Sequence, residues 1–513
     1  MQSSFGWSVE PPAAPPTADV DDDQFRLSDI GKLARRTRRR IVGAARADDR
    51  VTFTRLLNMH LGEAVAALDV VEESWPAYDH VNVSIGLEAW LGEGGRSHQL
   101  VGLINFRHRE FGLSDLLRPP EMEGYLPIPG NVSWANLPSG PGGEVRQCAR
   151  AGLYLVKEGS ARAAALIRAP DPESGMSAVH LQVVADRPGM AADIAARVRE
   201  LAVVHNVFRG QVISFGRDMF GERATALRFH TRPFMAAAEL ILSAETIAVI
   251  RRQVVGVAEH REKLLAAGQH LKRGLLLYGP PGVGKTHTVR FLMSQLTGTT
   301  VVELTGDALG LIGAACSVAR TLQPAMIVVE DVDLIAEDRG MHPGQHPLLF
   351  QLLNEMDGLA ADADVVFLLT TNRADLLEPA LAARPGRVDQ AVALELPDED
   401  ARRQLFALFR GGLVVDETRL DAIIERTEGV TAAFIKELLR RAAVIAATDG
   451  RTHLNVSADE LDAALEELMD TRNQMTRVLL GAHRDRPLMS AASFISEPGV
   501  MPYPLGGEEG ANW

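Results

Sequence analysis

Glycines and a lysine are spaced at residues 279–286 as a phosphate-binding loop requires. The segment reads Gly279-Pro280-Pro281-Gly282-Val283-Gly284-Lys285-Thr286, with His287 next, and fits the pattern GxxxxGK[ST]. An apolar run precedes it and a helical pattern follows, so the strand–turn–helix context is present. Glycines let successive backbone N–H groups turn towards an anion, and a helix N-terminus adds partial positive charge. We therefore expect Lys285 to reach the β- and γ-phosphates of ATP and the Thr286 hydroxyl to bind Mg²⁺.

Two carboxylates, Glu330 and Asp331, follow the apolar run at 326–329. Such a run suits a buried parallel strand, and ligands bind beyond the carboxyl ends of strands in open α/β sheets. We expect Glu330 to help hold Mg²⁺ and Asp331 to polarise the attacking water. The alternative is a solvated strand end without catalytic meaning.

A third apolar run, Val365 to Thr371, ends at Asn372, whose amide could orient water against the γ-phosphate. Arg384 and Arg387 follow around a Pro-Gly turn. In trans, two such guanidinium groups could stabilise charge on a neighbouring subunit's phosphoryl group. Taken alone, an arginine pair is usually a surface feature; its place after the other motifs favours the catalytic interpretation.

The elements that must position these residues follow from the pattern between 236 and 395, where strands alternate with helices. This alternation predicts an α/β fold, a parallel sheet with helices on both faces. Residues 396–475 read as helices, for example at 398–410 and 431–448, and predict a small helical lid. Residues 476–513 are rich in Gly and Pro and predict a flexible tail.

The amino-terminal half carries no comparable motif. Residues 1–49 predict a disordered arm with a basic helical segment, and residues 50–235 an α+β domain that could recognise a partner. Within that domain we expect strands at 81–91, 100–106, 153–156 and 179–184, and a helix at 190–204. Its histidines are not at metal-ligand spacings.

Composition limits the function classes. The 513 residues carry a net charge of −14, which argues against a nucleic-acid partner because phosphates attract basic surfaces. Only two cysteines are present, Cys148 and Cys316, and no run of 18 apolar residues occurs. We therefore expect a cytoplasmic protein without a membrane span. No HExxH motif occurs, so no attached zinc protease is expected.

Residues 238–470 resemble the AAA ATPase family, in the branch of proteasomal regulatory ATPases and other protein-unfolding machines. The resemblance rests on the loop at 279–286, the segments 352–359 and 371–373, Arg384-Pro385-Gly386-Arg387, and Thr427-Glu428-Gly429. It implies a P-loop AAA module with a helical lid, ATP hydrolysis with Mg²⁺, and a homo-oligomeric ring, usually a hexamer. It also implies arginine fingers at Arg384 and Arg387 that complete the adjacent subunit's site.

Three departures from the family pattern limit how much of the family's activity the resemblance implies for this chain. The family usually reads Asp-Glu where this chain reads Glu330-Asp331, so hydrolysis could be slow. Its lid motif Ser-Gly-Ala-Asp is replaced by residues 431–434, and Lys436 could compensate only if it faces the site. Leu311-Ile312 could stand in for the usual polypeptide-gripping element or simply pack in the core.

Three hypotheses remain. The first is an ATP hydrolase that remodels or unfolds a protein partner as a ring. The second is an ATP-dependent assembly switch or scaffold with little turnover, which the order Glu330-Asp331 suggests. The third, a nucleic-acid motor, is disfavoured by the negative charge and by the absence of interleaved aromatic and basic residues.

Overall fold

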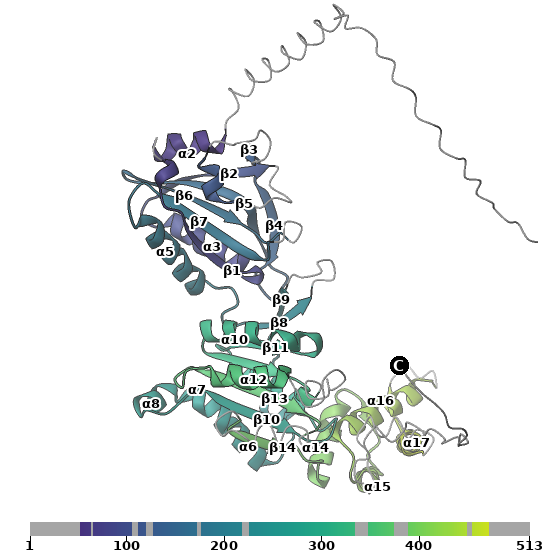
Figure 1. Cartoon of the computed structure of the whole chain (residues 1–513). Coiled ribbons are helices and arrows are strands. Elements are labelled where there is room, and N and C mark those ends of the chain that lie inside the picture. The colour runs from purple at the N-terminus through teal and green to yellow at the C-terminus, as the bar shows by residue number, and fades with distance from the viewer. Residues whose placement is uncertain are drawn as a thin grey trace, which may run out of the picture.

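The computed structural model describes residues 52–62, 65–104, 111–118, 127–171, 176–217, 225–333, 347–373, 388–448 and 454–470. They form an amino-terminal α+β domain, a larger α/β domain and a helical lid, in that order along the chain (Figure 1). The predicted arm at 1–49 and tail at 476–513 lie outside the described residues.

The amino-terminal domain is built on a seven-stranded sheet in the order β1-β7-β6-β5-β2-β3, with β4 paired to β5. All its pairings are antiparallel. Its strands are β1 (Val71–Pro76), β2 (Ser97–Ile104), β3 (Ile128–Gly130), β4 (Ser133–Pro138), β5 (Val145–Glu158), β6 (Ala161–Arg168) and β7 (Ala178–Ala185). Its helical elements are α2 (Phe53–Leu61), η1 (Val65–Ala67), η2 (Ala77–Asp79), α3 (His80–Gly92), α4 (Leu113–Leu116) and α5 (Met190–Val204).

Helices cover both faces of this sheet. Apolar residues of α3 and α5 pack on one face, and those of α2 and α4 pack on the other. The two longer helices approach closely at Gly86, where an added Cβ would lie 2.7 Å from the backbone oxygen of Val198 and the backbone nitrogen of Ala202. Glycine is therefore required by the contact between α3 and α5, not by its backbone angles.

The predicted strand at 81–91 is wrong, because these residues lie in the helix α3. From Val81 to Leu87, apolar residues alternate with small or polar ones, which imitates the period of a strand. Even Asn82 and Ser84 of this helix are buried, so it shows no polar stripe. A helix buried on nearly every side gives no 3.6-residue signal. The predicted helix at 190–204 is confirmed as α5.

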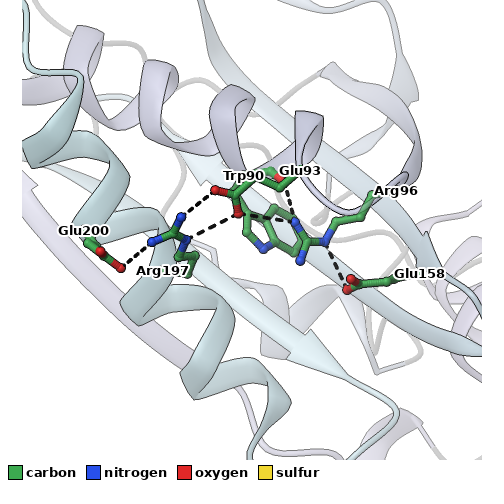
Figure 2. A network of polar contacts seen from close by, with 6 residues as sticks. All are labelled: Trp90, Glu93, Arg96, Glu158, Arg197 and Glu200. Carbon is green, nitrogen blue, oxygen red and sulfur yellow. Dashed lines mark hydrogen bonds and ion pairs between the residues drawn. The ribbon is translucent and has the colours of Figure 1, made fainter.

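Two arginines join the end of α3 to neighbouring elements (Figure 2). Arg197 of α5 donates to Glu93 at 2.6 Å and to Glu200 at 2.6 Å. Arg96 donates to the backbone oxygen of Trp90 at 2.7 Å and to Glu158 of β5 at 3.0 Å. These contacts satisfy the carboxyl end of α3 and hold it against both α5 and the sheet.

The second domain is built on a seven-stranded sheet in the order β14-β10-β13-β12-β11-β8-β9. All its pairings are parallel except that of β8 with β9. The strands are β8 (Val212–Arg217), β9 (Thr225–His230), β10 (Arg273–Tyr278), β11 (Thr300–Leu304), β12 (Ala325–Val329), β13 (Val365–Thr371) and β14 (Gln390–Ala393).

Helices cover both faces of this sheet too, which confirms the predicted α/β class. One core lies under α9 and the segment 250–255, and the other under α10 and α12. The helical elements are η4 (Ala237–Glu239), α6 (Ala244–Arg251), η5 (Arg252–Gly256), α7 (Val257–Glu259), α8 (Arg261–Ala266), α9 (Lys285–Gln295), η6 (Gly306–Leu311), α10 (Ile312–Thr321) and α12 (Pro347–Asp357).

The predicted boundary at residue 235 is wrong for this sheet, because β8 and β9 precede it. β8 pairs in parallel with β11, with Ile213 opposite Val302, and β9 pairs with β8. The antiparallel pair of β8 and β9 falls outside the alternation of strands and helices between 236 and 395, and nothing local in the sequence shows which sheet it joins. The sheet of the second domain thus has more strands than the alternating pattern indicated.

The two domains share a continuous core. Val81 and Cys148 of the amino-terminal domain pack in the same apolar cluster as Phe208 and α10. A cavity of about 170 Å³ lies at this junction, lined on one side by η2, α3 and α5 and on the other by α10. Asp79 lines it and accepts a hydrogen bond from Asn82 at 2.9 Å. Burial raises the pKa of the Asp79 carboxyl to about 6.

The lid contains α14 (Glu399–Arg410), α15 (Leu420–Arg426), α16 (Ala432–Thr448), α17 (Ala458–Met469) and the short pair β15 (Val414–Val415) and β16 (Asn455–Val456). Its helices have their own apolar core. Asp398 caps α14 by accepting from the backbone N–H of Ala401 at 2.8 Å. The helices predicted at 398–410 and 431–448 are confirmed.

No helix in the described part of the chain is both long and apolar enough to cross a membrane.

Candidate nucleotide site

Three strands of the parallel sheet bring the predicted site residues to one edge. β10 ends at the glycine-rich loop, β12 ends before Glu330, and β13 ends before Asn372. The strands are neighbours in the order β10-β13-β12 and run parallel, so their carboxyl ends meet. This edge is where ligands bind in open α/β folds.

Backbone angles of the loop at 279–286 explain its glycines. Gly279, Gly282 and Gly284 have φ values of +146°, +82° and +107°. A Cβ at Gly279 would also lie 2.3 Å from the carbonyl oxygen of Leu394. Only glycine adopts these angles without strain, so the loop is a curved backbone cradle that leads into α9.

Lys285 begins α9 and is largely buried, 7% exposed. Its Nζ donates to the carbonyl oxygens of Gly279 at 2.8 Å and of Pro280 at 2.9 Å. Burial lowers the pKa of the ammonium group, and the nearby Asp331 and Asp333 carboxylates oppose this. The charge therefore lies inside the cradle, where an anionic ligand would meet it.

Thr286 and Glu330 lie together, as the predicted metal pair. Burial raises the pKa of the Glu330 carboxyl and the neighbouring Asp331 adds to this, while the nearby Thr286 hydroxyl opposes it. One hydroxyl and one carboxylate next to a phosphate cradle fit Mg²⁺, which keeps several waters and takes its other oxygens from the nucleotide. Among the described residues, no cluster of three or more His, Cys, Asp or Glu could hold a metal by itself.

Asp331 has the only positive φ, 52°, among the described non-glycine residues. Its backbone N–H donates to Thr370 Oγ1 at 3.1 Å, and its Oδ1 accepts from Asn372 Nδ2 at 3.3 Å. A non-glycine residue in this region is rare and typical of functional sites. The structure thus brings Asp331 and Asn372 together on the wall of one cavity.

The sequence reasoning missed Asp333. This buried carboxylate accepts from Thr371 Oγ1 at 2.9 Å and from the backbone N–H of Asn372 at 3.3 Å. It thereby fixes the end of β13 on which Asn372 stands. The sequence did contain a signal for this residue, because Asp333 follows the same apolar run and lies two residues after Asp331.

A cavity of about 460 Å³ extends from the cradle to the lid, a volume within the usual range for small-molecule sites. His287 and Arg290 of α9 line its loop side, and an apolar wall lies further out. His287 Nε2 is 3.1 Å from the carbonyl oxygen of Glu239, which ties the segment before α6 to the loop. The apolar wall consists of Leu240, Ile241, Leu242, Leu405, Leu408 and Phe409.

The lid touches the phosphate loop directly. The backbone N–H of Ala433 donates to the carbonyl oxygen of Gly282 at 3.1 Å. A Cβ at Gly282 would lie 2.9 Å from both the Ala433 Cβ and Thr431 Oγ1. Residues 431–434, which depart from the family's usual motif, therefore still meet the loop, through the first turn of α16. Phe434 turns away into the lid core.

Two further predictions have different outcomes. Arg384 and Arg387 lie outside the described residues, so their role as arginine fingers remains a prediction. Ile312 is buried at 1% exposure in the core under α10, and Leu311 packs partly against the same core. The core-packing interpretation of this pair is the one the structure supports.

The cradle, the strand-end carboxylates and the lid define a P-loop nucleotide site. A sequence profile of the ATPase family associated with various cellular activities (AAA) matches residues 275–396. The chain therefore contains an AAA ATPase domain, as the motifs predicted.

Several bacterial proteins are similar over this region. ATP-dependent zinc metalloprotease FtsH 2 of Symbiobacterium thermophilum is 32% identical over 232 residues, which are 42% of this chain and 39% of that protein. FtsH of Thermus thermophilus is 31% identical, over 42% of this chain and 37% of that protein. FtsH 2 of Sphaerobacter thermophilus is 34% identical, over 41% of this chain and 34% of that protein. The matched region thus spans less than two fifths of the length of each of these relatives.

Proposed function

We propose that this protein binds ATP with Mg²⁺ and hydrolyses it in order to remodel or unfold a protein partner. The observation that carries the proposal is one cavity that joins the Lys285 cradle, Asp331 with Asn372, and the lid. The cradle would bind the phosphates, and Thr286 with Glu330 would hold Mg²⁺, which supplies Lewis-acid stabilisation of phosphoryl charge when bound. Asp331 would accept a proton from the attacking water while Asn372 orients it.

We further propose that the active form is a homo-oligomeric ring, with six subunits as the expected number. A ring is supported by the similarity to the AAA family and by the place of Arg384 and Arg387 in the sequence. The amino-terminal domain would select the protein partner, because it is a separate folded domain that lies outside the region matched by the AAA family profile. The negative net charge disfavours nucleic acid as that partner.

We also propose that the protein works in the cytoplasm. The support is chemical: Cys148 and Cys316 are both buried free thiols rather than a disulfide, as in a reducing compartment. Fractionation of cells that express the tagged chain tests this, and recovery in an envelope or extracellular fraction would contradict it.

Steady-state phosphate release with Mg-ATP tests the main proposal. The wild-type protein should turn over ATP, Lys285→Ala should lose ATP binding, and Asp331→Asn should bind ATP without hydrolysing it. Turnover per subunit that rises with protein concentration, together with ATP-dependent growth in mass by light scattering, is expected of a ring. A monomer with ATP at micromolar concentration would contradict the ring.

An ATP-dependent assembly switch is the second candidate, and the order Glu330-Asp331 favours it. The Asp331 carboxylate is one methylene shorter than glutamate and is held at 3.3 Å by Asn372, which limits its reach towards a water. Tight ATP binding and assembly without phosphate release by the wild-type protein would select this alternative.

A further inference from the structure

Lys436 lies on the lid wall of the same cavity that the phosphate loop lines. It belongs to α16, and Ala432, Ala433 and Lys436 line the same cavity. Residues three and four apart share one face of a helix, so Lys436 stands one turn beyond the residues that touch the loop. The first turn is fixed by the hydrogen bond from Ala433 to Gly282.

The positive charge of Lys436 is not neutralised by a carboxylate in the described part of the chain. Its Nζ lies 5.8 Å from the ring centroid of Phe409, which lines the same cavity. The adjacent Glu437 is engaged elsewhere, with Arg440 at 2.6 Å and Arg441 at 3.0 Å. Of the two carboxylates that line the cavity, Glu239 accepts from the backbone N–H of Ala236 and Asp331 from Asn372.

A cation that faces a phosphate-binding cavity without a counter-charge attracts an anionic ligand. The lysine stem is flexible and its head is a compact point charge, so it can reach a phosphate group without a fixed geometry. Phe409 and the neighbouring apolar wall would meanwhile contact the base.

We propose that Lys436 is a second cationic contact of the bound nucleotide, which the lid supplies to its phosphates. This inference rests on the proposed ATP binding and deepens it, because it makes closure of the lid depend on the number of phosphates. The lid would then be held against the large domain more strongly by ATP than by ADP.

Equilibrium binding of ATP, ADP and adenosine to the full chain tests this, with Lys436→Met to remove the charge and keep the stem. A hydrogen bond to a charged group is worth enough for about a tenfold loss of ATP affinity in this variant. The loss should be smaller for ADP and absent for adenosine, and Lys436→Arg should retain most of the affinity. Lys263→Met is the matched control, because Lys263 is exposed on α8 and does not line the cavity.

The outcomes separate the two proposals. If the wild-type chain binds ATP and Lys436→Met binds it equally well, the contact is disproved while ATP binding stands. An equal loss for all three ligands, adenosine included, would also overturn it, because the residue would then act on the nucleoside that all three share and not on the phosphates. If the wild-type chain itself fails to bind ATP, the proposed function fails and the contact fails with it.

Discussion

At the scale of single residues, the order of the two carboxylates after β12 distinguishes this site. Glu330 lies beside Thr286, and Asp331 lies beside Asn372 with a backbone angle that non-glycine residues rarely adopt. A misplacement of about 1 Å can cost on the order of 100-fold in rate. The length of each carboxylate side chain is therefore expected to affect turnover in addition to its charge.

The double variant Glu330→Asp with Asp331→Glu tests this. The longer side chain at 331 should reach further towards the attacking water, so we expect turnover to rise by about tenfold or more. Steady-state phosphate release at saturating Mg-ATP measures it. Glu330→Asp alone is the control and should lower turnover by loosening Mg²⁺, and a double variant slower than wild type would contradict the argument.

At the scale of elements, the amino-terminal domain depends on the close approach of α3 and α5. Gly86→Ala places a methyl group 2.7 Å from backbone atoms of α5. Overpacking of this kind costs about 1–3 kcal/mol, and we expect the free energy of unfolding to fall by that amount in denaturant titrations.

Gly92→Ala in the same helix is the matched control. A Cβ there has no neighbour within 4 Å, and the φ of Gly92 is not positive. Because alanine favours a helix over glycine, this variant should be neutral or up to about 1 kcal/mol more stable. Equal destabilisation by both variants would show that the contact at Gly86 has no special role.

The elements also show what sequence could predict. Motifs with fixed spacing, such as the loop at 279–286 and the carboxylates after β12, located the site because their chemistry is local. The elements misassigned were those defined by distant partners. They are α3, which is buried on nearly every side, and the pair β8 and β9, which join the sheet through β11, a strand that begins 70 residues after β9 ends. Lys436 could be suspected but not placed, because only the fold of the lid shows which way α16 faces.

At the scale of the whole molecule, the amino-terminal domain and the ATPase sheet form one packed body through β8, β9 and their shared core. A fragment that begins at residue 236 loses both strands and exposes the edge of β11. A fragment that begins at residue 205 keeps them. We expect the longer fragment to unfold cooperatively at a higher temperature, and equal melting temperatures would contradict this view of the sheet.

The junction between the domains should also respond to pH. The pKa of Asp79 is raised to about 6, so the folded chain binds this proton more tightly than the unfolded chain does. The stabilisation that the protonated Asp79 carboxyl gives to the folded chain is therefore complete below about pH 4 and is lost as the pH rises through 6. The loss should be of order 1–3 kcal/mol.

Asp79→Asn keeps an oxygen for the hydrogen bond from Asn82 and removes the charge. We expect this variant to be more stable than wild type at pH 8 and similar at pH 4, as measured by urea unfolding across that range. An unchanged slope of stability against pH in the variant would assign the dependence to other groups.

The shared core also has a mechanical consequence. The contact of Ala433 with Gly282 joins the lid to the large ATPase domain at the phosphate loop, whereas the amino-terminal domain packs against that domain on the side of α10. A rotation of the large ATPase domain relative to the lid at this contact would carry the amino-terminal domain with it, as a rigid arm. The far end of that domain would move further than the phosphate loop. A partner bound to that arm would move with the ATPase sheet, because the two domains share one apolar core.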